Sequence, residues 1–196
     1  MKRPLRLLLF ASLIPVGLVT YFLIKNSRAA TASPVYNVIR KSGGFEIRDY
    51  PALTLITTPM RNAGDDGSSF GNLFRYITGA NIQSQKIAMT TPVLVDTESE
   101  GNTMSFILPA SMAIADAPES SAKNVTVRSL PAARYAVLRF AHGNDFAARE
   151  AAVARLQEWV QSEKLQQKGT PFYGFYDPPW TPGFLRRNEV LLSVEK

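Results

Sequence analysis

The chain has 196 residues, 45% of them apolar, and it contains no cysteine. That length and apolar content suffice for one domain with a buried core, and the missing cysteines exclude disulfides, thiolate nucleophiles, iron–sulfur clusters and cysteine-type zinc sites. The net charge is +6, but residues 1–32 hold five of the 22 basic and none of the 16 acidic residues. The rest is nearly neutral and mixed in sign, so we expect no nucleic-acid partner.

A targeting segment is predicted at the N-terminus. Three basic residues precede the uncharged stretch Leu7–Ile24, and Lys25 and Arg28 follow it. As a helix this stretch would span roughly 27 Å, close to a hydrocarbon core of about 30 Å. It is either an uncleaved anchor with the domain on the exported, periplasmic side, or a signal peptide cut after Ala32. We therefore predict residues 1–32 as signal or anchor, residues 33–196 as the domain, and the cell envelope as the location.

The first half of the domain has the patterns of strands around one helix. A short amphipathic helix is predicted to begin at Ser68 or Ser69 and to stop at Gly79, with apolar residues at i, i+3, i+4 and i+7. Alternation and β-branched content predict the strands. These are Tyr36–Ile39, Phe45–Tyr50, Leu53–Thr57, Lys86–Val95 and Met104–Leu108.

The second half repeats the first. The segment Phe45–Ala52 recurs 80 residues later as Val125–Ala132, with Arg, Pro and Ala identical and the apolar alternation kept. A helix at Asp145–Leu165 follows, and further strands are predicted at Tyr135–Phe140, Phe172–Tyr176 and Asn188–Val194. The predicted fold class is α+β, a distorted β-barrel of two pseudo-symmetric halves with strands and one helix each.

Side chains for catalysis are scarce. His142 is the single histidine, so a Ser-His-Asp triad or a multi-histidine metal site is impossible or depends on this one ring. The nearest paired carboxylates, Asp65–Asp66 and Glu98–Glu100, lie in polar turns where solvation explains them. Nucleotide-binding and nucleophile-elbow motifs are missing as well. We expect no enzyme.

A loop rich in proline and aromatic residues precedes the last strand. Three prolines restrict it, and Trp180 and Phe184 offer ring area, which suits a wall for a flat apolar ligand or a loop packed on its own domain. The following Arg186 and Arg187 can bind ligand carboxylates or pair with a neighbouring acid such as Glu189.

Separated motifs in this chain resemble, in order and spacing over about residues 35–195, the SOUL family of heme-binding proteins. The motifs are Arg48-Asp-Tyr-Pro51, the helix segment Phe70–Asn81, Lys86-Ile-Ala-Met-Thr-Thr-Pro-Val93, Tyr176-Asp-Pro-Pro-Trp180 and Arg186-Arg-Asn-Glu-Val190. The resemblance implies a duplicated, barrel-like fold and reversible binding of heme or another tetrapyrrole in a shallow apolar groove beside the first helix.

Carried onto this chain, the resemblance implies a set of ligand-binding residues. The ring contacts would be Phe70, Leu73, Phe74 and Ile77, with Trp180 or Phe184 on the loop side and Arg75 near the propionates. We add Arg186 as a second carboxylate-binding candidate and keep His142 as a weak candidate for axial ligation.

The leading hypothesis is a non-enzymatic, monomeric tetrapyrrole-binding protein that contacts the membrane through its N-terminal segment. The alternative is an effector-binding or structural module on the same fold that takes another small amphipathic ligand. A hydrolase or a tetrapyrrole-modifying enzyme would require a carboxylate inside the groove.

Overall fold

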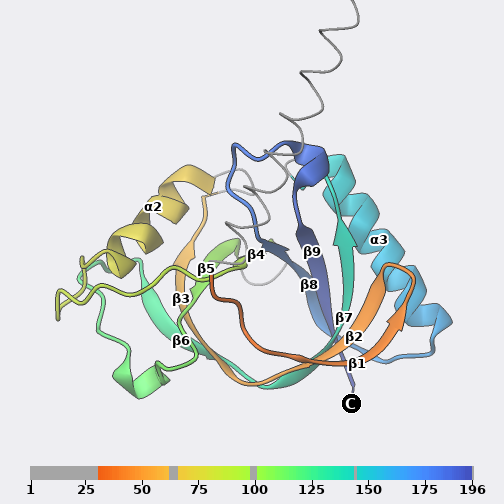
Figure 1. Cartoon of the computed structure of the whole chain (residues 1–196), viewed down its shortest axis with the longest axis horizontal. Coiled ribbons are helices and arrows are strands. Elements are labelled where there is room, and N and C mark those ends of the chain that lie inside the picture. The colour runs from red at the N-terminus through yellow and green to blue at the C-terminus, as the bar shows by residue number, and fades with distance from the viewer. Residues whose placement is uncertain (1–30, 62–65, 98–100, 144, 196) are drawn as a thin grey trace, which may run out of the picture. The chain divides into compact units, whose positions relative to one another are not determined.

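The computed structural model describes residues 31–61, 66–97, 101–143 and 145–195 (Figure 1). Residues 32–196 form a compact unit with its own core. Residues 1–30, nearly all of the predicted targeting segment, lie outside the described residues, as do Asp65 and Glu98–Glu100. Among the residues that are described, no helix is long and apolar enough to cross a bilayer.

The described chain folds into one antiparallel sheet with two α-helices, so the α+β class is confirmed. The strands are β1 Asn37–Ser42, β2 Phe45–Tyr50, β3 Leu53–Pro59, β4 Val93–Asp96, β5 Thr103–Ile107, β6 Thr126–Leu130, β7 Ala133–Phe140, β8 Gln167–Phe175 and β9 Asn188–Val194. The helices are α2 Asp66–Ile77 and α3 Phe146–Ser162, with 3-10 turns η1 Ile114–Asp116 and η2 Gly183–Leu185.

The sheet carries the predicted duplication in its strand order, which is β1-β2-β7-β9-β8-β4-β5-β3-β6. Strand β1 has no counterpart. In the other eight strands, β2, β3, β4 and β5 correspond to β6, β7, β8 and β9 in that order. Exchanging each strand for its counterpart gives the same strand order read in the opposite direction. The register has the same symmetry, because Ile47 pairs with Ala136, and Val127, 80 residues after Ile47, pairs with Ile56. A pseudo-twofold axis therefore passes between β4 and β8.

The predicted barrel is not closed. Strands β1 and β6 are the two edges of the sheet, paired with β2 and β3 respectively. All six residues of β1 are exposed, and Arg40 and Lys41 give this edge the charges that keep a free strand in water. The sheet instead curls around an apolar inner layer that its own side chains fill, among them Tyr50, Tyr135 and Phe172.

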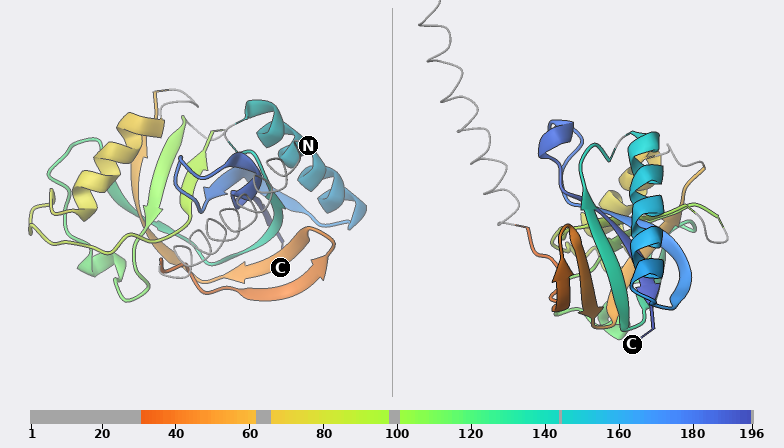
Figure 2. Two further views of the ribbon diagram at one scale, coloured as in Figure 1. Left: turned by 45° about the horizontal axis from the view of Figure 1, so that its top comes forward. Right: turned by 90° about the vertical axis from the view of Figure 1, so that its right-hand side faces the viewer.

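The sheet has an apolar layer on each face because alternate residues point to opposite sides. On one face α2 packs against β3 and β5, and α3 packs against β7 and β9, at opposite ends of the sheet (Figures 1 and 2). Ile56 and Leu73 belong to this helix-side core. Leu55, next to Ile56, belongs to the inner layer of the curl.

Several element boundaries differ from the prediction, such as the start of β8, which lies at Gln167 and not at Phe172. The strand predicted from Lys86 is limited to β4, because Thr90 bridges Ala32 and donates its hydroxyl to the Ile107 carbonyl, and Pro92 has no N–H for a ladder. Helix α2 begins before the predicted serine cap, and Ser69 donates to the Pro59 carbonyl at 3.2 Å. The start of α3 is as expected, since Asp145 caps it by accepting from the Ala147 amide.

A buried carboxylate on β9 connects strand β2 with the segment between β8 and β9. Glu189 on β9 is 0% exposed and accepts from Arg48 of β2 at 2.7 and 3.1 Å. It also accepts from Arg187 at 2.7 Å and from the Tyr176 hydroxyl at 2.9 Å. Burial disfavours its charge, but the two guanidinium groups outweigh burial and hold the pKa of Glu189 below its ordinary value. Tyr36 lies under the Arg48 guanidinium at 4.4 Å and joins the cluster.

Replacing Glu189 with glutamine should cost about 3 kcal/mol of unfolding free energy, because the buried Arg48 loses its buried counter-charge and keeps only Glu46, whose side chain is 22% exposed. Urea unfolding at neutral pH measures the loss. The control is Asp49→Asn, which breaks the ion pair of Asp49 with Arg134, whose side chains are 27% and 24% exposed. This change should cost about 0.2–1 kcal/mol. Equal losses in the two variants would contradict a special role for the buried pair.

Acid should remove the contribution of Glu189. Because its pKa is lowered by folding, the stabilisation is complete above the unfolded value of about 4.3 and is lost as the pH falls through the folded value. The difference in unfolding free energy between the wild type and Glu189→Gln should therefore shrink below about pH 4. A difference that stays constant down to that range and below it would show that the carboxylate charge is not what stabilises the fold.

Candidate functional site

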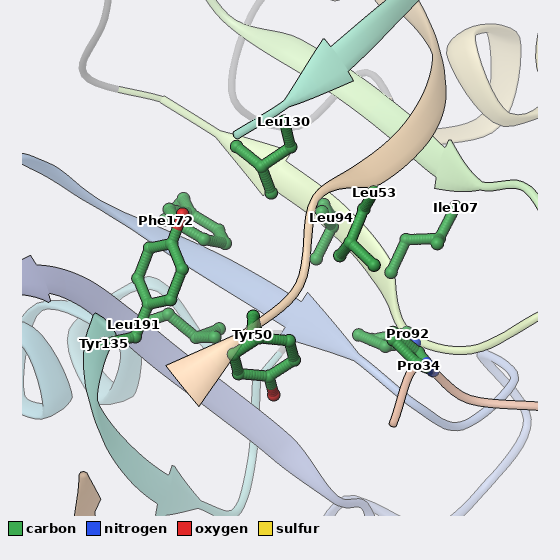
Figure 3. A pocket seen from close by; sticks show the side chains of 10 residues that line it. All are labelled: Pro34, Tyr50, Leu53, Pro92, Leu94, Ile107, Leu130, Tyr135, Phe172 and Leu191. Atoms are coloured by element: carbon green, nitrogen blue, oxygen red, sulfur yellow. The ribbon is translucent and has the colours of Figure 1, made fainter. Parts of the chain in front are cut away.

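The inner layer of the curled sheet holds a small apolar cavity at the pseudo-twofold axis (Figure 3). Its volume is about 20 Å³, room for a single water molecule. It is lined by Pro34, Tyr50, Leu53, Pro92, Leu94, Ile107, Leu130, Tyr135, Phe172 and Leu191. Burial among these groups raises the pKa of Tyr50 to about 12.

A second cavity of about 70 Å³ adjoins the first and shares Leu94, Leu130 and Phe172 with it. Ligand pockets of proteins usually measure about 300–1,000 Å³. Neither cavity therefore encloses a molecule as large as a tetrapyrrole, so the candidate site for such a ligand lies on the outer surface of the fold.

Helix α2 presents a pair of aromatic rings to solvent. Phe70 and Phe74 are 38% and 46% exposed and stack on each other with centroids 5.9 Å apart and planes 16° apart. Phe70 also meets the edge of Phe106, a buried residue of β5, at 5.1 Å. The pair thus forms an exposed wall that continues into the helix-side face of the sheet.

The wall borders an apolar floor formed by the central strands. Val93 of β4 pairs with Phe106 of β5 on one side and with Phe175 of β8 on the other, so the three side chains form a row across the sheet. Val93 and Phe175 are half-buried, and strands β4 and β8 lie between the pair covered by α2 and the pair covered by α3. We call the row Val93, Phe106 and Phe175 the inter-helix floor, which the Phe70 and Phe74 wall borders.

One cationic group lies against the inter-helix floor, and a second lies on the helix that carries the wall. Arg149 of α3 places its guanidinium 5.4 Å from the centre of the Phe175 ring and donates Nε–H to the Gly143 carbonyl. Arg75 lies in the last turn of α2, is exposed, and donates to the Asn72 side chain. An apolar surface with a guanidinium over Phe175 and another next to Phe74 in the chain suits a planar ligand that carries carboxylates.

The two other residues of the predicted helix stripe are not on the surface. Leu73 is 0% and Ile77 is 4% exposed, and both belong to the helix-side core. In this structure they support the helix, and contact with a ligand would require α2 to move. The stripe therefore divides into an outer pair, Phe70 and Phe74, and an inner pair that packs.

The proline-rich loop is built on the other half of the sheet. Trp180 and Phe184 are 82% and 70% exposed, and the Gly183 carbonyl between them accepts from the His142 amide at 3.1 Å. Arg186 donates Nε–H to the Thr181 carbonyl at 2.6 Å and so holds the loop together. The loop thus joins the turn between β7 and α3, whereas the aromatic pair stands on α2.

The predicted site residues therefore fall into separate places, and their contact with a ligand stays a prediction. Phe70, Phe74 and Arg75 lie together on α2, while the proline-rich loop lies beside His142. His142 is exposed and has a positive φ of 59°. Within the described ranges, no three His, Cys, Asp or Glu side chains are grouped so that they could hold a metal ion.

Sequence reasoning missed Val93, Phe175 and Arg149 as members of the site. Phe175 was placed in a strand, but which face it takes depends on the register with β4 and β9. Arg149 lies in the first turns of α3, and only its packing over Phe175 marks it. Its spacing of three residues from Phe146 places it on the same side of α3 as that residue, which was the one signal in the sequence for its position.

Comparison with protein families gives one match that covers most of the chain. The family model described as SOUL heme-binding protein matches residues 31–193. Among curated proteins no sequence matches the chain significantly.

Solved structures with a similar fold share little sequence with the chain. The crystal structure of the EcmrR C-terminal domain superposes with a TM-score of 0.56 at 14% identity, covering 83% of this chain and 99% of that one. An uncharacterized conserved protein from Listeria innocua superposes with a TM-score of 0.58 at 10% identity, covering 78% and 92%. A protein of the same organism described as a hydrolase gives 0.53 at 8% identity, covering 80% and 94%. At these identities the likeness shows the fold alone.

The division of the α2 stripe can be measured with two neighbouring residues. Leu73→Ala should cost about 2–5 kcal/mol of unfolding free energy, because it opens a cavity in the core. Phe74→Gln should cost no more than about 1 kcal/mol, because the ring is half exposed. Urea unfolding of the two variants tests this. If Phe74→Gln proved as costly as Leu73→Ala, Phe74 would be a core residue and the wall would lose its role.

Proposed function

The chain belongs to the SOUL heme-binding protein family, and on this premise we propose that it binds heme or another tetrapyrrole reversibly over the inter-helix floor. The macrocycle lies against Val93 and Phe175, with the stacked rings of Phe70 and Phe74 along one side. The propionates extend towards Arg75 or Arg149. The observation that carries the proposal is the exposed aromatic pair, which continues through Phe106 to the half-buried Val93 and Phe175, with the Arg149 guanidinium over the Phe175 ring.

Apolar contact supplies the binding free energy in this arrangement, and the iron needs no protein ligand. A tetrapyrrole supplies a broad flat apolar surface and two carboxylates, and the floor offers the complementary groups. Because such a ligand remains partly open to solvent, it exchanges readily. This is the behaviour of a carrier or buffer. The side chains that we place around the ligand are apolar or are arginines, and neither kind serves as a general acid or base at neutral pH.

We place this activity at the cell envelope. The uncharged stretch 7–24 with basic flanks supports either an anchor or a signal peptide. We favour the anchor, because Ala32, after which a peptidase would cut, is held in the fold by its bridge to Thr90 and its bond from the Thr91 amide. The domain then stands on the periplasmic side.

A different flat amphipathic ligand could use the same floor. The fold alone does not distinguish heme from other ligands of that shape. The duplicated sheet and the position of the floor at its pseudo-twofold axis support an effector-binding module equally well. Competition of such ligands with hemin would separate the two functions.

Titration with hemin tests the proposal. Wild type should show a saturable site of micromolar or tighter affinity in the Soret band, and Phe74→Asp should weaken it about tenfold or more, because it places a charge in the wall. The control is Phe146→Asp, which makes the same change at a phenylalanine at the start of α3 that is more exposed, 64% against 46% for Phe74.

Two further variants locate the site. Arg149→Gln should weaken hemin binding modestly, and His142→Ala should leave the Soret spectrum unchanged. Loss of binding in His142→Ala together with an intact site in Phe74→Asp would move the ligand to the turn between β7 and α3. Absence of saturable binding in the wild type would overturn the heme proposal.

A further inference from the structure

The tip of the proline-rich loop combines large exposed rings with side chains that carry no charge. The eight residues Pro178–Leu185 contain no ionisable side chain, and Trp180 and Phe184 are the two most exposed aromatic side chains among those described. The flanking charges are turned inward. Asp177 accepts from the Arg187 amide at 2.6 Å, and Arg186 donates to carbonyl groups of the loop.

The backbone of this tip is largely satisfied by the loop itself. The carbonyls of Pro178, Pro182 and Gly183 accept from amides, and those of Pro179 and Thr181 accept from the Arg186 side chain. The three prolines have no N–H to satisfy. A loop whose polar backbone groups are already bonded can leave water for a less polar medium at little cost.

The loop also lies at the end of the sheet where the chain enters the domain. Ala32 accepts from the Thr91 amide at 2.8 Å, and Thr91 precedes Pro92 and β4. Pro92 packs so closely on Gly174 of β8 that a β-carbon there would lie 3.3 Å from it, and Val93 pairs with Phe175, just before the loop. In the right-hand view of Figure 2, the orange start of the described chain and the dark blue η2 both lie on the side of the sheet away from α3.

We propose that this loop contacts a lipid bilayer, with Trp180 and Phe184 in the interfacial region of the membrane that holds residues 7–24. The inference rests on the anchor that the proposed function assumes. Residues 25–31 extend at most about 25 Å, so an anchored domain stays close to the lipid headgroups. Tethering raises the local concentration of the loop to about the millimolar range, so two aromatic side chains suffice for contact. Tryptophan favours this interface because its ring is apolar and its N–H stays in water.

The two tryptophans of the chain allow a direct test in the full-length protein. Trp159→Phe leaves Trp180 as the reporter, and Trp180→Phe leaves Trp159, which lies on α3 and stacks on Phe45 at 4.8 Å. Each variant is reconstituted in vesicles of phosphatidylcholine and phosphatidylglycerol, with and without bromine on the upper acyl chain. Brominated lipid should quench Trp180 several-fold more than Trp159. An alkaline carbonate wash of the same vesicles reports whether the chain is anchored.

Each outcome decides a separate point. Selective quenching of Trp180 in chains that stay with the vesicles supports the loop contact. Chains that stay but show no quenching, or equal quenching of both tryptophans, overturn it while leaving the anchor in place. Chains released by carbonate overturn the anchor and the loop contact together. Heme binding is measured by the hemin titration and does not depend on any of these results.

Discussion

Three segments of the chain converge on the buried carboxylate of Glu189. Arg48 ties β2 to it, while Arg187 and Tyr176 tie the two ends of the proline-rich loop to it. The ring of Tyr36, at the entry of the chain into the domain, lies under the Arg48 guanidinium. The segment around Tyr36 and the proline-rich loop are therefore both held by the buried ion pair of Arg48 and Glu189. Rigid presentation of exposed rings at the loop tip is possible because its base cannot move without uncovering a buried charge.

The inter-helix floor is a result of the pseudo-symmetry. Each repeat sends its helix to cover the strands of its own half, β3 and β5 or β7 and β9. The pair β4 and β8 at the axis lies between the two covered regions, and there Val93 and Phe175 remain half-buried, whereas Val95 and Tyr173 further along the same strands are buried. Two helices related by twofold symmetry cover the outer strands and leave an apolar strip uncovered between them. A planar ligand matches such a strip better than a compact one.

The strands were the part of the fold that local sequence could predict. Phe45–Tyr50 and Asn188–Val194 were placed without error because their alternation or apolar run is carried by adjacent residues. The order of the strands in the sheet could not be predicted, because the pairing of β2 with β7 joins residues that lie about 90 apart in the sequence.

For the site, spacing predicted that Phe70, Leu73, Phe74 and Ile77 share one side of α2. It could not divide them into exposed and buried pairs, which depends on where Phe106 and the rest of β5 lie.

The exchange of strands between the repeats bears on how such a chain could arise. β2 of the first repeat completes the half-sheet of the second, and β6 of the second completes that of the first. In a protein consisting of one repeat, the edge position of the half-sheet would be empty. Two copies of that protein could fill it by exchanging their first strands. The present chain has the architecture of such a homodimer fused into a single gene product. Fusion frees equivalent positions to diverge: Arg48 now meets a buried carboxylate, whereas Arg128, its counterpart 80 residues later, donates to the hydroxyls of Thr57 and Ser105.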